Sequence, residues 1–537
     1  MRTRTKGFVR KIISGTLAAV IAVSTMATTV FADDPYTTYS YDYWLDPIPS
    51  QSVYRVDSAV SGTEMGLSAL SDKTSPLYIS DTESDILDSP QDIYYEETLK
   101  NFWIVDSQNQ RILRTDENLK IIGCYKTMMG AKSGTLELKK PGGVFVKVDS
   151  AGVPTMYIAD TENSRVVVAT VTGALTCSVT MELTIPDADI YTQKSKSFTP
   201  SKVLVDDVGT IYVVVSSINT GSVVFNKKGE FTGFYGANRV AVTADIIKER
   251  IWRIFKSDEQ LSSMVRNVPT EYANFDIRDG FIYTVTEASN TATDAVKKLN
   301  AGGYNTWDNE VGNKYTFGDT FWAEEYVSGD TVVYSTQLTD IDVMDNGNIN
   351  IIDFTSGRVF QYDKYANLIA IFSSNSSGNS AQLGTVDSIT AVESKGSEVY
   401  VVDSSKDNIT IFTETVFGKY VHKAFALYDE GKYTEAENDW AEVLKRDGTY
   451  TMAYVGLGKA YLGEEKYKDA MDNFKEAYDQ LNYDKAFRYY REAWLRDNFN
   501  NILIGVLIFI LVVMVVKKLR KRGYLHPIAF ISRKIFK

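Results

Sequence analysis

The middle of the chain alternates short apolar runs with polar turns, and residues 156–168 show the pattern most clearly. Tyr157 and Ile158 begin a run rich in β-branched and aromatic residues, residues 160–164 are polar, and residues 165–168 are again apolar. Short apolar runs bounded by Asp, Asn and Ser are typical of a β-hairpin. This stretch therefore predicts a strand, a tight turn and a second strand.

The same unit occurs again at residues 102–113, 349–360 and 399–411, each time with an Asp at the end of the first run. In all, six units follow one another. Their predicted second strands are residues 101–105, 155–159, 210–215, 281–286, 348–352 and 398–402. Repeated four-strand units predict a mainly β fold, a six-bladed β-propeller, because a β-sandwich would not repeat the same Asp-turn-Arg pattern.

An Asp followed by a polar turn and then Arg-Val or Arg-Ile resembles the NHL repeat of β-propellers. The signature residues are Asp106, Arg111, Asp160, Asn163, Arg165, Asp353, Arg358 and Asp403. Because the carboxylate recurs at one place in each unit, we expect it to order the hairpin by accepting backbone N–H bonds. We expect the arginines to link neighbouring blades through carboxylates or carbonyls.

The sixth unit has no fourth strand, because the pattern becomes helical soon after residue 412. An isolated strand at residues 52–56 precedes the first unit and offers the missing partner. Closing the ring in this way would remove an exposed sheet edge; the alternative is that this strand packs on the side of the ring. Residues 33–51 form an aromatic-rich lead-in, so the propeller is expected over residues 52–415.

Two insertions interrupt the predicted ring, at residues 237–271 and 301–337. The first contains a basic amphipathic helix with Ile247, Ile251 and Ile254 at helical spacing, which either packs on its own domain or lies on a membrane. The second is polar, Gly-rich and aromatic, and predicts a long loop of the kind that often binds a ligand.

From residue 420 onward the apolar period becomes 3.6, and Ala436 and Ala470 align two copies with a spacing of 34 residues. This is the length and residue pattern of the tetratricopeptide repeat, in which small residues let helices approach and aromatics fill the groove between them. The second copy carries Tyr454, Leu457, Gly458, Tyr461, Ala470, Phe474 and Ala477. Residues 416–498, which end in a capping helix, are expected either to bind a peptide or to act as a spacer.

The two ends of the chain carry targeting patterns. Residues 1–32 combine a basic start, an apolar run at 12–23 and small residues before position 33, which predicts a secretory signal peptide; the alternative is an uncleaved anchor. Residues 502–516 are apolar without interruption and are followed by five basic residues within 517–522. We therefore predict a transmembrane helix at residues 499–519 and a basic cytoplasmic tail at 520–537, rather than a buried core helix.

Composition narrows the possible functions. A chain of 537 residues requires several domains, and a net charge of −12 excludes a general nucleic-acid partner. Cys124 and Cys177 fall in strands of different units, which predicts free buried thiols. With His422 and His526 as the only histidines and no phosphate-binding or nucleophile motif, we expect no catalytic residue, no cofactor and no metal.

The propeller shape also hosts lactonases and esterases of the gluconolactonase type, which resemble one another in holding calcium through carboxylates and Asn in the central channel. A rival interpretation is therefore a metal-dependent propeller hydrolase. The carboxylates it would use here are Asp106, Asp160, Asp353 and Asp403.

The order of signal peptide, NHL propeller, tetratricopeptide unit and membrane helix resembles a family of bacterial membrane-anchored surface proteins. In that family a Yip-type membrane domain usually follows, and His526, Pro527 and Phe530 match its start. The resemblance implies an extracytoplasmic binding or scaffold protein, accessory to carbohydrate uptake. Its partners would be the membrane and a protein or glycan at the propeller or tetratricopeptide surface; a purely structural spacer is a third possibility.

Overall fold

The computed structural model describes residues 36–130, 134–185, 198–216, 221–236, 272–287, 295–307, 317–319, 323–327, 330–334, 336–376 and 382–522. The predicted signal peptide, the amphipathic helix of residues 237–271 and residues 523–537 lie outside this described part. The chain divides into two compact units at residues 419 and 420. We treat each unit by itself.

The first unit is a ring of six antiparallel sheets, so the predicted six-bladed propeller is confirmed. Blade one consists of β4 (Pro90–Glu96), β5 (Asn101–Asp106), β6 (Arg111–Thr115) and β7 (Ile121–Tyr125). Blade two contains β10 (Pro141–Val148), β11 (Pro154–Asp160), β12 (Arg165–Val171) and β13 (Cys177–Leu183). Blade three consists of β14 (Pro200–Val205), β15 (Ile211–Val215), β16 (Ser222–Phe225) and β17 (Phe231–Tyr235).

Blade four shows three strands in its described part, and blades five and six show four each. Blade four contains β18 (Tyr272–Arg278), β19 (Phe281–Thr286) and β20 (Val296–Leu299). Blade five consists of β23 (Leu338–Val343), β24 (Ile349–Asp353), β25 (Arg358–Tyr362) and β26 (Leu368–Phe372). Blade six consists of β29 (Ile389–Lys395), β30 (Glu398–Asp403), β31 (Asn408–Glu414) and β3 (Tyr54–Ser61). The innermost strands β4, β10, β14, β18, β23 and β29 adjoin one another in that order and enclose a central channel.

Both faces of each blade are buried against neighbouring blades, and the strand sequences reflect this. The second strands are apolar at nearly every position, and all six residues of β5 are buried. The apolar clusters lie between successive blades, such as the one that joins Phe102 and Ile104 of blade one to Tyr400 and Val402 of blade six. Cys124 and Cys177 are buried and unpaired, as predicted, and burial raises the pKa of both thiols to about 12.

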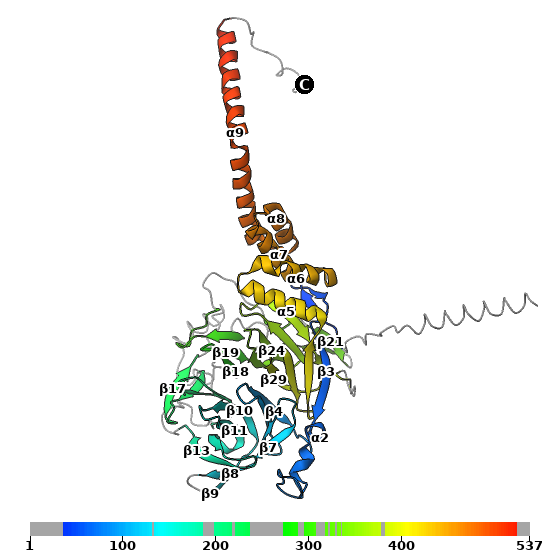
Figure 1. Ribbon diagram of the computed structural model, residues 1–537, viewed down its shortest axis with the longest axis vertical. Coiled ribbons are helices and arrows are strands. Elements are labelled where there is room, and N and C mark those ends of the chain that lie inside the picture. The colour runs from blue at the N-terminus through cyan, green and yellow to red at the C-terminus, as the bar shows by residue number, and fades with distance from the viewer. Residues whose placement is uncertain are drawn as a thin grey trace, which may run out of the picture. The chain divides into compact units, whose positions relative to one another are not determined.

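The ring closes through β3, which pairs antiparallel with β31 from Tyr54 opposite Glu414 to Ser61 opposite Asn408. In Figure 1 this blue N-terminal strand lies beside the yellow strands of the last blade. Predicted closure is therefore confirmed, although the strand is longer than residues 52–56. Tyr54 anchors it, because its ring lies 4.5 Å from that of Phe372 and its hydroxyl accepts a hydrogen bond from Gln361.

Several short elements decorate the ring. They are β1 (Tyr39–Tyr41) and β2 (Pro47–Pro49) in the lead-in, α2 (Gly62–Met65) and the 3-10 turn η1 (Leu67–Leu70) after β3, β8 (Thr127–Gly130) and β9 (Gly134–Glu137) beside blade two, the 3-10 turn η2 (Thr161–Asn163), and β27 (Ser374–Asn375) with β28 (Thr385–Val386). Strand β8 pairs parallel with β13, so blade two has six strands.

The predicted long loop at residues 301–337 is wrong in part. β21 (Ala323–Val327) pairs antiparallel with β22 (Asp330–Tyr334), because the β-branched and aromatic run of β22 favours a strand. Trp307 is also buried, with its ring 5.6 Å from that of Phe317. Much of this insertion is therefore folded.

The second unit is helical, with α5 (Val416–Asp429) leading into it, followed by α6 (Tyr433–Arg446), α7 (Thr451–Gly463), α8 (Tyr467–Glu476) and α9 (Gln480–Lys521). Successive helices from α6 to α9 pack on one another, as tetratricopeptide repeats do. Gly456 and Gly458 permit this approach: a Cβ on Gly456 would lie 2.1 Å from Trp440 Nε1, and one on Gly458 would lie 2.5 Å from the Phe474 ring.

The predicted capping helix and transmembrane helix are one unbroken element. α9 has 42 residues, which corresponds to about 63 Å at 1.5 Å per residue. It is the one helix in the described part that is long and apolar enough to cross a membrane. Its apolar segment is unburied within the chain, which suits a lipid environment.

Candidate functional site

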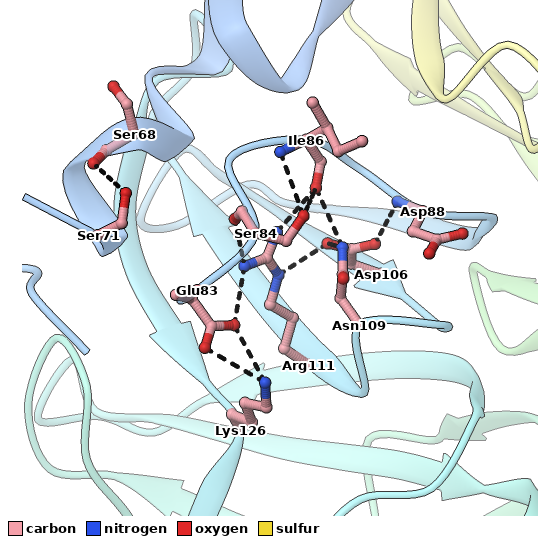
Figure 2. Close-up of polar contacts among 10 residues, drawn as sticks. All are labelled: Ser68, Ser71, Glu83, Ser84, Ile86, Asp88, Asp106, Asn109, Arg111 and Lys126. Carbon is pink, nitrogen blue, oxygen red and sulfur yellow. Dashed lines mark hydrogen bonds and ion pairs between the residues drawn. The ribbon is translucent and has the colours of Figure 1, made fainter. Parts of the chain in front are cut away.

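The signature hairpin of blade one is built around the buried pair Asp106 and Arg111, neither of which has any exposed surface. Asp106 accepts hydrogen bonds from the Asp88 backbone N–H at 2.8 Å, from the Asn109 side chain at 2.9 Å and from Arg111 Nε at 2.7 Å. Figure 2 shows these bonds converging on the carboxylate. The pair therefore fixes the turn between β5 and β6.

The remaining guanidinium nitrogens of Arg111 bind the segment that enters blade one from the closing strand. They donate to the carbonyls of Ser84 and Ile86 at 2.9 and 3.0 Å and to the Glu83 carboxylate at 3.1 Å, as Figure 2 also shows. The arginine thus connects the hairpin to the chain that arrives from blade six.

The other signature aspartates repeat this arrangement. Asp160, Asp353 and Asp403 accept backbone N–H bonds from Lys139 at 2.7 Å, Gln337 at 2.8 Å and Asp387 at 2.7 Å, each in the connection that leads into the same blade. Arg165 and Asn163 both donate to Asp160. Arg358 differs, because its guanidinium donates to Asp319 at 2.7 Å instead of to Asp353.

The rival interpretation placed calcium-binding carboxylates at these four aspartates, and this placement is wrong. They end the second strand of their blades, whereas the channel is lined by the first strands. These hairpin carboxylates also already accept hydrogen bonds from backbone N–H groups beside their own turns. The residues predicted to form a tetratricopeptide groove lie inside the helical unit: Leu457, Gly458, Ala470, Phe474 and Ala477 are buried and Tyr454 and Tyr461 are half-buried.

The channel carries carboxylates that the sequence analysis did not single out. Its lining includes Asp92, Asp276, Asp340, Asp342 and Glu393. Three of them join blades, because Asp92, Asp276 and Asp340 accept the backbone N–H of Val144, Val343 and Val392 in the following blade at 2.7 to 2.8 Å. These N–H groups belong to the inner edge strand of each sheet and lack a strand partner on the channel side.

Lys202 is the channel's ammonium group and reaches across from blade three to blade one. Its Nζ lies 2.5 Å from Asp92 Oδ1. Burial alone would lower the pKa of Lys202, but the carboxylates of Asp92 and Asp340 outweigh burial and raise it. Burial raises the pKa of Asp340 and of Asp342 to about 7 and that of Asp276 to about 6.

At the end of the channel where the inner strands finish, an ion pair joins two facing blades. Arg278 at the end of β18 in blade four lies 3.1 Å from Glu97 of blade one and 3.0 Å from Asp345. Blades one and four are three positions apart in a ring of six, so this contact crosses the channel.

The channel residues do not fit a metal ion. Within the described part of the chain, no group of three or more His, Cys, Asp or Glu side chains is arranged to hold one. Val144, Val343 and Val392 already occupy one oxygen each of Asp92, Asp276 and Asp340, and the Lys202 ammonium supplies a positive charge among them. We therefore derive no metal-dependent step.

The channel widens into a cavity of about 500 Å³ at the end where the inner strands begin, which we call the mouth. This volume lies within the range of small-ligand sites. All six blades contribute to it. Its lining is Ser89, Gln91, Ser107, Gln108, Lys140, Pro141, Gly142, Thr161, Ser201, Lys202, Glu287, Gln337, Thr339, Phe354, Ile389 and Thr390.

Three mouth residues, Ser107, Thr161 and Phe354, directly follow a signature aspartate. The aspartates therefore position the rim even though they do not line it. These residues could not be singled out in the sequence because they look like ordinary turn residues; only their common position after the repeated Asp distinguishes them. Gly143 is needed beside the rim, since a Cβ there would lie 2.6 Å from the Ser201 carbonyl oxygen of blade three.

Comparisons with known proteins add little beyond the fold. The sequence matches no family model, and no curated protein matches it. Similar solved structures include a virginiamycin B lyase from Staphylococcus aureus (9% identity, 61% of this chain and 95% of that chain covered, TM-score 0.33). They also include a calcium-binding regucalcin from Agrobacterium tumefaciens (11%, 60% and 89%, TM-score 0.34) and a protein of unknown function from Bacteroides thetaiotaomicron (12%, 61% and 70%, TM-score 0.37).

Proposed function

We propose that this chain is a membrane-tethered binding protein whose propeller recognises a protein or carbohydrate partner outside the cytoplasm, as an accessory to a transport system. The observation that carries the proposal is the mouth, a cavity of about 500 Å³ to which every blade contributes. Its uncharged hydroxyl and amide groups are suited to hydrogen bonding with a ligand. The mouth is a recognition surface held on a rigid frame.

The rest of the chain supports tethering. α9 supplies one apolar segment long enough to cross a membrane, and residues 517–522 behind it are strongly basic. Basic residues favour the cytoplasmic side, so the propeller and the helical repeats would lie outside. The helical repeats would hold the propeller near the bilayer or dock a further protein.

Recognition is better supported than hydrolysis. A metal-dependent hydrolase would need several converging carboxylates with free oxygens. In the described channel one oxygen each of Asp92, Asp276 and Asp340 accepts a backbone N–H and the second oxygen of Asp92 binds Lys202, while Asp340 Oδ1 has no hydrogen-bond partner. The carboxylates join neighbouring blades, which is a structural use. We therefore propose that the protein is not an enzyme.

The test uses the full chain in nanodiscs, incubated with solubilised cell-envelope fractions and then washed. Gln108→Trp places a bulky ring at the rim, because Gln108 is exposed and lines the mouth. Asn118→Trp is the matched control, since Asn118 is an exposed turn residue that does not line the mouth.

We expect the wild-type chain and Asn118→Trp to retain the same protein or glycan and Gln108→Trp to lose most of it. Equal retention by all three chains would contradict binding in the mouth. Failure of the wild-type chain to retain anything would contradict the proposed function itself.

A further inference from the structure

The mouth contains hydrogen-bonding groups that the protein leaves unused. Ser107 is 6% exposed and lines the mouth, yet within the described residues its hydroxyl has no partner. The side-chain amide of the neighbouring Gln108, which is exposed, also has none. A hydrogen bond contributes about 0.5–1.5 kcal/mol net, so a ligand that supplies these partners would be stabilised at both positions.

The charged groups of the mouth, in contrast, already face partners. Lys140 lies 2.7 Å from the Glu162 carboxylate and Lys202 lies 2.5 Å from that of Asp92. Glu287 accepts a hydrogen bond from the Gln337 amide at 3.2 Å. An acidic or basic ligand would have to compete with these contacts. The unused hydrogen-bonding groups of the mouth therefore favour an uncharged ligand.

Phe354 adds an apolar surface to this polar rim. Phe354 is 42% exposed, and its main chain is held in place because its backbone N–H donates to the Gln337 carbonyl at 2.9 Å. The C–H face of a sugar ring can pack on such an aromatic ring while its hydroxyls reach the surrounding Ser, Thr and Gln side chains. A ligand that is apolar on its ring faces and rich in hydroxyls at its edges satisfies both features.

We infer that the mouth binds an uncharged, polyhydroxylated ligand, a neutral glycan, through Ser107 and Gln108 with Phe354 against a sugar ring. This inference rests on the proposed function and names the class of ligand for the same site. A peptide is the competing occupant.

The test titrates the full chain in nanodiscs with neutral oligosaccharides of glucose, mannose and N-acetylglucosamine, with oligogalacturonate as the acidic counterpart, and with uncharged peptides. At least one neutral oligosaccharide should bind, with an affinity unchanged within about twofold between low and high salt, because no charge pairing is involved. Ser107→Ala should weaken it roughly 3- to 10-fold through loss of one hydrogen bond.

Two controls separate loss of a ligand contact from a general effect on the propeller. Thr339→Val keeps the shape of a mouth side chain and removes a hydroxyl that is buried and has no partner, so neither stability nor affinity should fall. Ser404→Ala is the matched control for Ser107→Ala. Ser404 also follows a signature aspartate, but its hydroxyl already lies 3.1 Å from that of Ser388 and it does not line the mouth.

Tighter binding of oligogalacturonate or of a peptide would overturn the inference while leaving recognition by the mouth intact. The same holds if no neutral oligosaccharide binds at millimolar concentration although envelope material is retained through the mouth. Neutral binding that is unaffected by Ser107→Ala and Gln108→Trp would place the ligand elsewhere and overturn the inference and the proposed function together.

Discussion

Arg111 illustrates how one residue can organise a repeat. Its guanidinium has no exposed surface and is shared between two carboxylates and two carbonyls. A buried ion pair gives little net stability compared with apolar residues of similar volume. Removing one partner, however, leaves the other charge unpaired in an interior of low dielectric constant. The residue therefore matters most for holding the first blade to the closing segment.

Arg111→Met should destabilise the propeller by about 3–5 kcal/mol, because Asp106 and Glu83 remain buried without this partner. Arg165→Met is the matched control in blade two and should cost less, since the Arg165 side chain is 19% exposed and water can solvate the site. Urea unfolding of both variants checks the prediction. Equal losses would show that burial of the pair does not decide its contribution.

The channel carboxylates predict a pH dependence. Burial holds the pKa of Asp340 and Asp342 at about 7, whereas a carboxyl in the unfolded chain has a pKa of about 3.9. The folded state therefore binds protons that the unfolded state releases, and their contribution is lost as the pH rises through about 7. Lys202, Asp92, Asp276 and Glu393 face these groups and set the magnitude.

We expect thermal unfolding of the propeller at a higher temperature at pH 5.5 than at pH 8. Asp340→Asn should flatten part of this slope, because the amide stays neutral at both values and can still accept the Val392 N–H. An unchanged slope in this variant would mean that Asp340 is ionised throughout the range.

At the scale of elements, the sequence predicted the strands well and the channel poorly. Apolar runs such as β5 and β24 are buried on both faces, so their boundaries follow directly from composition. The inner strands carry single polar residues. Whether these residues line the channel depends on which strand of each blade lies nearest the axis, and only the closed ring determines this. The β8–β9 hairpin was missed because its pairing with β13 is a long-range contact without a local pattern.

The helical repeats depend on glycine where helices meet. Gly458→Ala gains about 1 kcal/mol of helix propensity, but its Cβ would lie 2.5 Å from the Phe474 ring, and overpacking costs about 1–3 kcal/mol. We expect faster amide hydrogen exchange in α7 and α8 of the full chain. Gly463→Ala is the control, with nothing nearer than Thr434 Oγ1 at 3.9 Å, and should leave exchange unchanged or slower. Equal protection in both variants would contradict close packing at Gly458.

At the scale of the whole molecule, the chain combines a closed ring with one apolar helix. Closure through β3 joins residues that are more than 350 positions apart, such as Tyr54 and Glu414, so the ring is complete only when both ends of the propeller are present. α9 places the basic residues 517–522 at one end of a continuous helix. The sequence could indicate this order of parts, but the mouth emerged only from the assembled ring.

The most direct test of the account is the reaction rate of Gln108→Cys with a membrane-impermeant maleimide, measured in intact cells and on the purified, washed full chain. Cys124 and Cys177 are buried and should not react, and Asn118→Cys serves as the exposed control. We predict that Cys at position 108 is labelled in intact cells, but several-fold more slowly than in the purified chain because a ligand occupies the mouth, while position 118 reacts equally in both. Labelling only after permeabilisation, or equal rates at position 108, would contradict an outward-facing mouth that binds a ligand.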